Sequence, residues 1–421
     1  MEKFIIEESG PLFGKVKISG SKNSVLPIIA ATLLTEENCV ISDVPPLADV
    51  LTMRELLEDL GGNVSWVADR ETLSICTKNI NKTQVSYELC SKMRASFLLA
   101  GPILARCNEV MISLPGGCAI GSRPVDLHLK GLAALGAEIS QDHGYIHARA
   151  KRLQGANIYL DFPSVGATEN IMMAACLAQG QTIIQNCAVE PEIVDLSNFL
   201  SSMGAQIRGS GTDTIRINGV DRLKGTTHSV IPDRIEAGTF MIAAAISGGD
   251  ILLENIVVDH LKPSIAKMRE ANIELVVGEE GMRVIGSAPR SNIDLKTLPY
   301  PGFPTDMQAQ FVAMLATTPG TNIVTETVFE NRFMHTAELI RMGADIKIDS
   351  RTAIIEGVSK LTGSQVRATD LRAGAALILA AMGAQGTTEI KDIHHIDRGY
   401  HNFDKKLRGL GAKIRREGIL K

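Results

Sequence analysis

The stretch Leu135-Gly136-Ala137-Glu138-Ile139 recurs along the chain with a period of about seventy residues. In each copy an amphipathic segment ends in Leu or Met, a Gly follows, and an apolar strand begins. The Gly stands where a helix C′ residue needs a positive φ. Further copies lie at residues 60–64, 203–207, 342–346 and 410–414, and a weaker one lies at 270–275. This periodicity predicts a chain built from six copies of one unit.

A second feature repeats with the same period, because an Ala-rich apolar segment precedes each signature. These segments predict helices that start near Ser24, Arg94, Gly166, Ala237, Asp306 and Leu371. One strand lies between the two helices of a copy, as at residues 110–114, and a hairpin follows the signature, as at residues 207–217. The unit is therefore helix, strand, helix, strand, strand, which predicts an α/β fold with right-handed crossovers.

The ends of the chain indicate how the six copies divide into domains. Several copies carry Leu-x-Gly and then a strand after the hairpin, but the sixth copy stops before this part. Residues 12–19 supply it at the N-terminus. We therefore expect residues 22–231 to form one three-repeat domain, and residues 1–21 with 232–421 to form a second, closed by the N-terminal strand. Two chain crossings favour hinge motion and an active site in the cleft between the domains.

Length and composition exclude several classes of protein. A chain of 421 residues is too long for one ordinary core. The net charge is −4 without a long basic run, so nucleic acid is not an expected partner. The N-terminus is charged and the apolar runs are short, so no signal peptide and no membrane association are expected. Seven cysteines without a CxxC pair fit a reducing cytoplasm and offer no metal-ligand spacing. The oligomeric state is left open.

Polar residues that are unusual for a core gather at the start of the Ala-rich helices. Helix N-termini present free N–H groups and partial positive charge, which suit phosphate and carboxylate ligands. The alternative is that the Thr and Asp residues at 305–306 and 369–370 are only N-caps. A cation at such a position opposes the helix dipole, and a bound anion would offset that cost. The residues are Lys22-Asn23, Arg94, Ser164-Val165-Gly166, Asp233 to Glu236, Thr305-Asp306 and Asp370-Leu371-Arg372.

The segment Leu114 to Asp126 places Cys118 among three Gly and two Pro, with Arg123 close behind. A thiol near an Arg gains thiolate character and reactivity, although an incidental loop thiol is the alternative. The segment is not a P-loop, and no GxGxxG follows a strand, so no dinucleotide cofactor is indicated. The neighbouring His394 and His395 are expected to face different ways and to be structural.

Five segments of the chain resemble the enolpyruvyl transferases, and the resemblance covers nearly the whole chain in order. The segments are residues 18–23, 114–126, 303–308, 330–333 and 396–400. The Pro-Gly-Gly-Cys sequence at 115–118 is similar to the branch of the family that uses UDP-N-acetylglucosamine. The branch that uses shikimate 3-phosphate lacks this loop. The resemblance implies two inside-out α/β barrel domains, each of three βαβαββ units with helices inside and sheets outside.

The resemblance also implies a reaction. The enolpyruvyl group of phosphoenolpyruvate is transferred to the 3′-hydroxyl of UDP-N-acetylglucosamine and phosphate is released, in the first committed step of peptidoglycan synthesis. The reaction is an addition and elimination through a tetrahedral intermediate, and no metal or organic cofactor is implied. Two alternatives stay open. One is an enolpyruvyl transferase for another acceptor, such as shikimate 3-phosphate, and the other is a non-catalytic nucleotide-sugar-binding paralogue.

Residue roles follow from the resemblance by position. Cys118 is expected to protonate the methylene carbon of phosphoenolpyruvate and to be alkylated by fosfomycin, and Asp306 is expected to act as general base. Lys22, Arg123 and Arg398 are expected to hold phosphoenolpyruvate. The catalytic set implied is Cys118, Asp306, Lys22, Arg398 and Asp370. The substrate-binding set implied is Lys22, Asn23, Arg94, Arg123, Pro124, Val125, Asp126, Leu127, Ser164, Val165, Gly166, Asp306, Val328, Arg332, Arg372 and Arg398.

Overall fold

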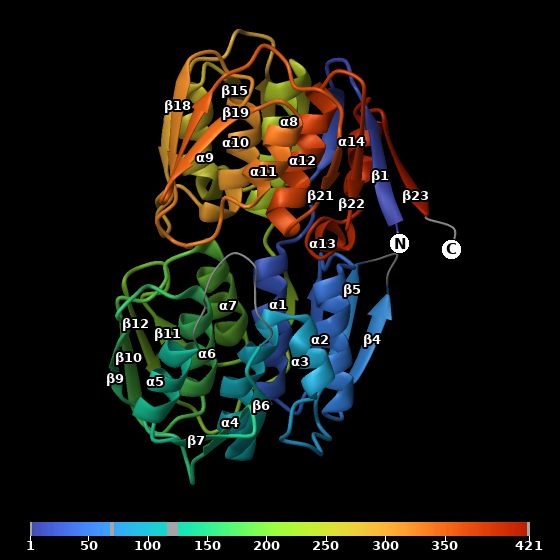
Figure 1. Cartoon of the computed structure of the whole chain (residues 1–421). Helices are drawn as coiled ribbons and strands as arrows, with labels where there is room; N and C mark the ends of the chain where they lie inside the picture. Colours follow the sequence, from blue (N-terminus) through green and yellow to red (C-terminus); the bar gives the residue numbers. More distant parts are fainter. Residues whose placement is uncertain (1, 68–70, 116–124, 419–421) are drawn as a thin grey trace. The chain divides into compact units, whose positions relative to one another are not determined.

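The structure, a computed structural model, describes residues 2–67, 71–115 and 125–418 (Figure 1). These residues form two compact units. Unit 1 contains residues 2–19 and 232–418, and unit 2 contains residues 20–115 and 125–231. Within the described ranges, no helix combines the length and the apolar character that crossing a membrane requires.

Each unit has three inner helices, which correspond to the predicted Ala-rich segments. In unit 2 they are α1 (Lys22–Ala31), α4 (Ala100–Cys107) and α6 (Val165–Ala175). In unit 1 they are α8 (Arg234–Ser247), α10 (Gln308–Leu315) and α12 (Leu371–Gly383). The helices of unit 1 pack on one another in pairs (Figure 1). They are buried on all sides, as in α8 from Ile235 to Ala245, and small Ala side chains permit this close packing.

Two of the predicted helix starts differ from the structure. The expected helices near Arg94 and Asp306 begin as 3-10 turns, η3 (Arg94–Leu99) and η5 (Thr305–Met307), and the α-helices start only afterwards. Such tight turns are common at helix ends, and their pattern of apolar residues does not differ from that of an α-helix over so few residues.

Each unit also contains outer helices, in addition to the three inner ones. In unit 2 they are α2 (Ala48–Asp59), α3 (Tyr87–Lys92), α5 (Asp126–Ala134) and α7 (Pro191–Ser202). In unit 1 they are α9 (Lys262–Glu270), α11 (His335–Arg341), α13 (His394–Asp397) and α14 (Phe403–Gly409). The predicted C′ glycines have positive φ, including +94° at Gly136 and +93° at Gly343. In the weaker copy Asn272 takes this conformation, with φ of 63°.

The described strands form five four-stranded sheets and one three-stranded sheet, and none of these sheets closes on itself. The strands of unit 2 are β3 (Cys39–Ser42), β4 (Asn63–Val67), β5 (Thr72–Cys76), β6 (Glu109–Ser113), β7 (Glu138–Asp142), β8 (Tyr145–Arg149), β9 (Asn157–Tyr159), β10 (Gln181–Gln185), β11 (Gln206–Arg208), β12 (Thr214–Asn218) and β13 (Thr227–Ser229). In most sheets a short strand pairs in parallel with the inner strand, and the hairpin pairs on its other side, as in the order β9-β10-β12-β11. The three-stranded sheet, β6-β8-β7, has only a single bridge from Gln84 to Met111 in place of the short strand.

Unit 1 repeats this arrangement. Its strands are β1 (Glu2–Glu7), β2 (Phe13–Lys17), β14 (Asp250–Glu254), β15 (Glu274–Gly278), β16 (Gly281–Ile285), β17 (Asp294–Lys296), β18 (Thr321–Thr325), β19 (Asp345–Asp349), β20 (Thr352–Glu356), β21 (Gln365–Arg367), β22 (Thr387–Lys391) and β23 (Ile414–Gly418). The predicted α/β repeat is confirmed, because burial alternates along strands such as β16 and places one face of the sheet against the helices.

The N-terminal segment completes unit 1. β2 pairs in parallel with β14 of the fourth repeat, just as β13 pairs with β3 in unit 2. β1 lies between β22 and β23 and pairs with both in antiparallel register, with Phe4 opposite Ile390 and Ile6 opposite Ile414. It therefore takes the place of the missing hairpin strand of the sixth repeat, which the sequence pattern did not indicate.

Candidate active site

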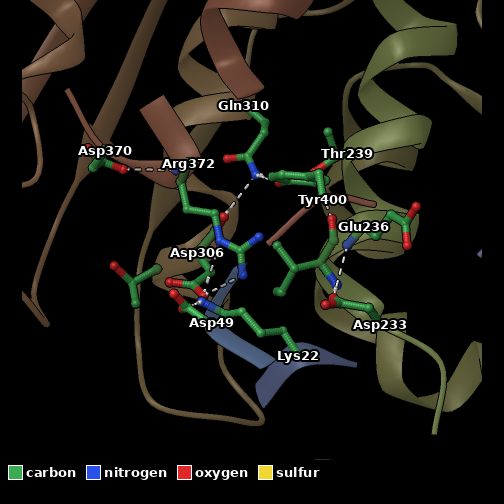
Figure 2. A network of polar contacts seen from close by, with 12 residues as sticks. Lys22, Asp49, Asp233, Glu236, Thr239, Asp306, Gln310, Asp370, Arg372 and Tyr400 are labelled. Carbon is green, nitrogen blue, oxygen red and sulfur yellow. Dashed lines mark hydrogen bonds and ion pairs between the residues drawn. The ribbon is translucent and has the colours of Figure 1, made fainter. Parts of the chain in front are cut away.

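Three of the predicted site residues meet in unit 1 at Asp306, which lies in η5. Its Oδ1 accepts a hydrogen bond from Arg332 Nη2 at 2.9 Å, and its Oδ2 accepts from Arg372 Nη2 at 3.0 Å (Figure 2). The two arginine side chains are only 4% exposed, whereas that of Asp306 is 27% exposed. Both oxygens of a partly accessible carboxylate are therefore held by buried cations, which stabilise its ionised form.

Arg372 retains a donor for a ligand. Its Nη1 is buried and has no hydrogen-bond partner among the described residues. Burial opposes the charge of the guanidinium, but Tyr400, Asp306 and Asp233 outweigh it and raise the pKa of Arg372. Because an unpaired buried N–H is costly, this nitrogen indicates a site for an anionic oxygen.

A buried hydrogen-bond network supports Arg372 from its other side (Figure 2). The guanidinium lies 5.4 Å from the centre of the Tyr400 ring. The hydroxyl of Tyr400 lies 2.9 Å from Thr239 Oγ1, and Gln310 Nε2 donates to the backbone carbonyl of Asp306 at 3.0 Å. Thr239 and Gln310 belong to α8 and α10, so the starts of all three inner helices of unit 1 contribute to the network.

Asp370 caps a helix, whereas its counterpart Asp306 does not. Asp370 Oδ1 accepts from the backbone N–H groups of Arg372 and Ala373, at 2.9 and 3.1 Å, and caps α12. Asp306 caps no helix, because its carboxylate is occupied by the two arginines. Arg398 is half-buried and directly follows α13 as its C-cap.

His335, the first residue of α11, is not among the site residues that the sequence predicts. Burial lowers its pKa to about 4, Asp370 acts in the opposite direction, and the charge of Arg332 lowers it further. Its Nε2 is buried and has no hydrogen-bond partner among the described residues. A neutral imidazole thus lies close to two predicted site residues, and no local sequence signal marks it.

In unit 2 the predicted lysine lies at the start of α1. Lys22 Nζ is 3.3 Å from Asp49 Oδ2, and Asp49 is almost fully buried in the first turn of α2 (Figure 2). Asn23 is half-buried at the next position of α1. The pairing keeps a charged ammonium group at a helix N-terminus, where the dipole alone would oppose it.

The segments predicted to bind the nucleotide meet around His128. This residue follows Val125, Asp126 and Leu127 at the start of α5. Asn170 Nδ2 lies 3.0 Å from His128 Nδ1, and a Cβ placed on Gly166 would lie 3.2 Å from its ring. Burial lowers the pKa of His128 to about 3, and the charge of Arg94 adds to this shift. A neutral His128 therefore joins three predicted segments. Ser164 caps α6 beside them by accepting from Ala167 N at 3.3 Å.

Cys118, Arg123 and Pro124 lie outside the described residues. Of the six described cysteines, Cys39, Cys90, Cys176 and Cys187 are buried. Burial raises the pKa of Cys176 to about 12 and that of Cys187 to about 11, so these thiols are poor nucleophiles.

The two neighbouring histidines do not face different ways, which corrects the expectation. The rings of His394 and His395 lie 4.1 Å apart in α13, because a short helix rather than a strand carries them. Among the residues that the structure describes, no group of three or more His, Cys, Asp or Glu side chains is arranged to hold a metal ion.

Known proteins share both the sequence and the fold. The family model of EPSP synthase (3-phosphoshikimate 1-carboxyvinyltransferase) matches residues 6–407. UDP-N-acetylglucosamine 1-carboxyvinyltransferase 1 of Caldanaerobacter subterraneus is 59% identical over 99% of both chains. UDP-N-acetylglucosamine 1-carboxyvinyltransferase 2 of Carboxydothermus hydrogenoformans is also 59% identical, again over 99% of both chains.

Two solved structures share the fold at lower identity. The enolpyruvyl transferase NikO of Streptomyces tendae has a TM-score of 0.90 at 23% identity, covering 99% of this chain and 98% of that one. EPSP synthase of Acinetobacter baumannii has a TM-score of 0.78 at 19% identity, covering 99% of this chain and 100% of that one. The match over residues 6–407 and the 59% identity together show that this chain belongs to the EPSP synthase family of enolpyruvyl transferases.

Proposed function

We propose that the chain transfers the enolpyruvyl group of phosphoenolpyruvate to the 3′-hydroxyl of UDP-N-acetylglucosamine and releases phosphate. The observation that carries this proposal is the carboxylate of Asp306 between two buried arginines, one of which keeps an unpaired N–H. The relatives that are 59% identical are named for this activity. A cytoplasmic location and a place in peptidoglycan synthesis are part of the proposal.

The proposed addition step forms a C–O bond and a C–H bond. The sugar hydroxyl attacks C2 of phosphoenolpyruvate and passes its proton to Asp306, while the thiol of Cys118 gives a proton to C3. In the elimination step the Cys118 thiolate takes a proton back from C3, the double bond is restored, and phosphate leaves C2. The two arginines hold both oxygens of Asp306 and so orient the carboxylate as the proton acceptor.

Charge neutralisation is the second task of the proposed site. Phosphoenolpyruvate carries about three negative charges, and one cation about 4 Å away contributes roughly 4 kcal/mol before desolvation. We assign its phosphate and carboxylate to Lys22, Arg123 and Arg398, with Asn23, Arg332, Asp370 and Arg372 around them. The nucleotide sugar is assigned to Arg94, residues 123–127 and 164–166, Asp306 and Val328. The proposal requires residues of both units to reach the same substrates.

The strongest alternative acceptor is shikimate 3-phosphate, after which the matching family model is named. The test measures phosphate release from phosphoenolpyruvate by the pure protein with each acceptor. We expect turnover with UDP-N-acetylglucosamine and at least about 10³-fold less with shikimate 3-phosphate, because an acceptor without the nucleotide leaves its polar partners unpaired. The reverse ratio would establish the alternative. Binding of UDP-N-acetylglucosamine without any turnover would establish the other alternative, a non-catalytic protein that binds the nucleotide sugar.

Cys118 has a separate test. Fosfomycin carries an epoxide that a thiolate opens, forming a C–S bond and leaving a hydroxyl. We expect mass spectrometry to find the adduct on the peptide that contains Cys118, and UDP-N-acetylglucosamine to change its rate of formation. Cys118→Asp keeps an acid and escapes alkylation, so we expect it to retain turnover. Adducts found only at other cysteines would remove Cys118 from the proposed mechanism.

A further inference from the structure

Four of the six repeats share a link between the inner strand and its short parallel neighbour. The residue directly after the inner strand is Asp or Asn with φ between 53° and 59°. Its side chain forms a hydrogen bond of 2.5 to 2.8 Å to the end of the neighbouring strand. The links are Asp43 to Ser229, Asn186 to Leu160, Asn255 to Ile18 and Asp392 to Arg367.

The fifth repeat keeps this link but replaces the residue. Glu326 directly follows β18, and its backbone is not in the positive-φ region. Its Oε1 accepts a hydrogen bond from Thr297 Oγ1 at 2.8 Å, and Thr297 directly follows β17. Asp or Asn would suffice for the strand link. The longer Glu side chain therefore has a second use.

The additional contacts of Glu326 reach predicted site residues. Its Oε2 accepts from Thr305 Oγ1 at 2.8 Å, and Thr305 directly precedes Asp306. Its Oε1 also accepts from the backbone N–H groups of Val328 at 2.8 Å and Phe329 at 3.2 Å. The hydroxyl of Thr305 in turn accepts from Arg332 Nη1 at 3.3 Å. One carboxylate thus joins η5 to the loop that follows β18.

Burial makes this junction rigid. Glu326 is 1% exposed, so its carboxylate depends on its four donors for the stabilisation that water would otherwise give. Breaking one of these hydrogen bonds leaves a buried carboxylate oxygen poorly satisfied, which is costly. The backbone of Val328 and the start of η5 are therefore fixed relative to each other.

We propose that Glu326 is a positioning residue that sets the spacing between Asp306 and Val328 and thereby the binding of the sugar acceptor. This inference rests on the proposed function, in which both residues contact the sugar. Glu326 acts through Thr305 and through the Val328 N–H, and no hydrogen bond joins it to Lys22 or Arg398 in the described structure. Its loss should therefore affect the acceptor more than phosphoenolpyruvate, which it reaches indirectly through Thr305 and Arg332.

The test compares steady-state constants of variants in the phosphate-release assay. For Glu326→Ala we expect the KM for UDP-N-acetylglucosamine to rise roughly tenfold or more and kcat to fall by a similar factor, with the KM for phosphoenolpyruvate within about twofold. Glu326→Gln keeps the shape and one acceptor oxygen, so it should recover most of the acceptor affinity. Thr305→Val removes the link to η5 together with the contact from Arg332 Nη1, and it should lower kcat more than it raises either KM.

A matched control lies in the same sheet. Glu356 ends β20 and accepts from the Thr321 hydroxyl at 2.9 Å, but on the exposed face. Glu356→Ala should leave all three constants unchanged, and thermal unfolding of every variant reports its folding. If Glu326→Ala does not fold, Glu326→Gln and Thr305→Val carry the test.

The outcomes separate this inference from the proposed function. A wild-type protein without turnover on UDP-N-acetylglucosamine would contradict the proposed function itself. An active wild type whose folded Glu326 and Thr305 variants keep normal constants would overturn only the positioning role. Equal changes in both KM values would also overturn it, because they would indicate a general loss of structure.

Discussion

Asp306 illustrates how two buried arginines determine the chemistry of one partly accessible carboxylate. Arg372 contacts it through both Nε and Nη2, at 3.3 and 3.0 Å, which a lysine cannot reproduce. We expect Arg372→Lys to lower kcat roughly 10²-fold, because the ammonium group would leave one carboxylate oxygen incompletely held. Steady-state phosphate release measures this effect.

The control for this substitution is an exposed arginine that contacts an aspartate through the same two nitrogens. Arg283 donates to Asp250 through Nε and Nη2 on the exposed surface of unit 1. Arg283→Lys should change kcat by less than about twofold, because exposed ion pairs contribute little. An Arg372→Lys protein as active as Arg283→Lys would show that the buried pair has no part in turnover.

Glu169 is a buried acid in α6 with no assigned role. Burial raises its pKa well above the usual value, and the charges of Glu192 and Glu190 add to the shift. Because the folded pKa is raised, the stability linked to this group is complete below about pH 4.5 and declines as the pH rises. We expect Glu169→Gln to raise Tm by a few degrees at pH 7 and by almost nothing near pH 4.

Thermal unfolding between pH 4 and pH 8 tests this expectation. Glu138→Gln, at an exposed position of β7, serves as the control for loss of one charge and should give nearly constant Tm differences across the range. A Glu169→Gln protein that is less stable than wild type at pH 8 would mean that the ionised carboxylate is stabilised in the fold.

The predicted site residues differ in how much the sequence could say about them. Lys22, Arg94 and Arg372 stand out because a cation at the start of an apolar helix is unusual within its own segment. Glu326 and His335 gave no such signal. Their surroundings come from segments that burial brings together, so their chemistry depends on contacts that no local pattern contains.

Two helices, α5 and α11, carry a buried histidine at the same position of their repeats. His128 in α5 and His335 in α11 each stand seven residues before the Leu or Met of their repeat signature, in the second and fifth copies. Burial lowers the pKa of His128 to about 3 and that of His335 to about 4. Each unit therefore holds one neutral imidazole at the same position of its middle repeat.

The low pKa of these histidines predicts that the protein loses stability as the pH falls. The folded pKa of His128 lies below its usual value of 6.5, so its stabilising contribution is complete above pH 6.5 and is lost as the pH falls. At pH 5 the loss is about 2 kcal/mol. We expect chemical denaturation to show a smaller decline from pH 7 to pH 5 for His128→Gln than for wild type. His143→Gln, at an exposed turn, should decline like wild type.

The helix ends could be predicted because their signal lies within a few residues. The place of β1 in its sheet could not, because it depends on residues far away in the sequence. A Gly with positive φ after an amphipathic segment is a signal contained in a few residues, and Gly136 and Gly343 follow it. β1 pairs with β22 and β23, which are more than 370 residues away in sequence. Its apolar pattern shows that it is a strand, but no pattern within it indicates which strands it pairs with.

The two units of the molecule differ in how much their stability depends on the N-terminal segment. Unit 2, described over residues 20–67, 71–115 and 125–231, closes with its own strand, because β13 pairs with β3. Unit 1 needs residues 2–19, the segment that carries β1 and β2, because this segment places five buried apolar side chains in its core. At about 1.5 to 3 kcal/mol each, these side chains contribute roughly 10 kcal/mol, which is comparable with the whole stability of a domain. The five are Phe4, Ile6, Leu12, Val16 and Ile18.

We therefore expect a fragment of residues 20–231 to fold alone and residues 232–421 to remain unfolded without residues 1–19. Circular dichroism and urea unfolding of each fragment measure this difference. The matched control joins residues 1–19 behind residue 421 through a short loop, which is feasible because Gly418 pairs with Glu2 at the end of the β1–β23 register. This permuted unit should unfold cooperatively, since it regains both strands. A fragment of residues 232–421 as stable as the permuted unit would show that the two N-terminal strands are dispensable for the core they complete.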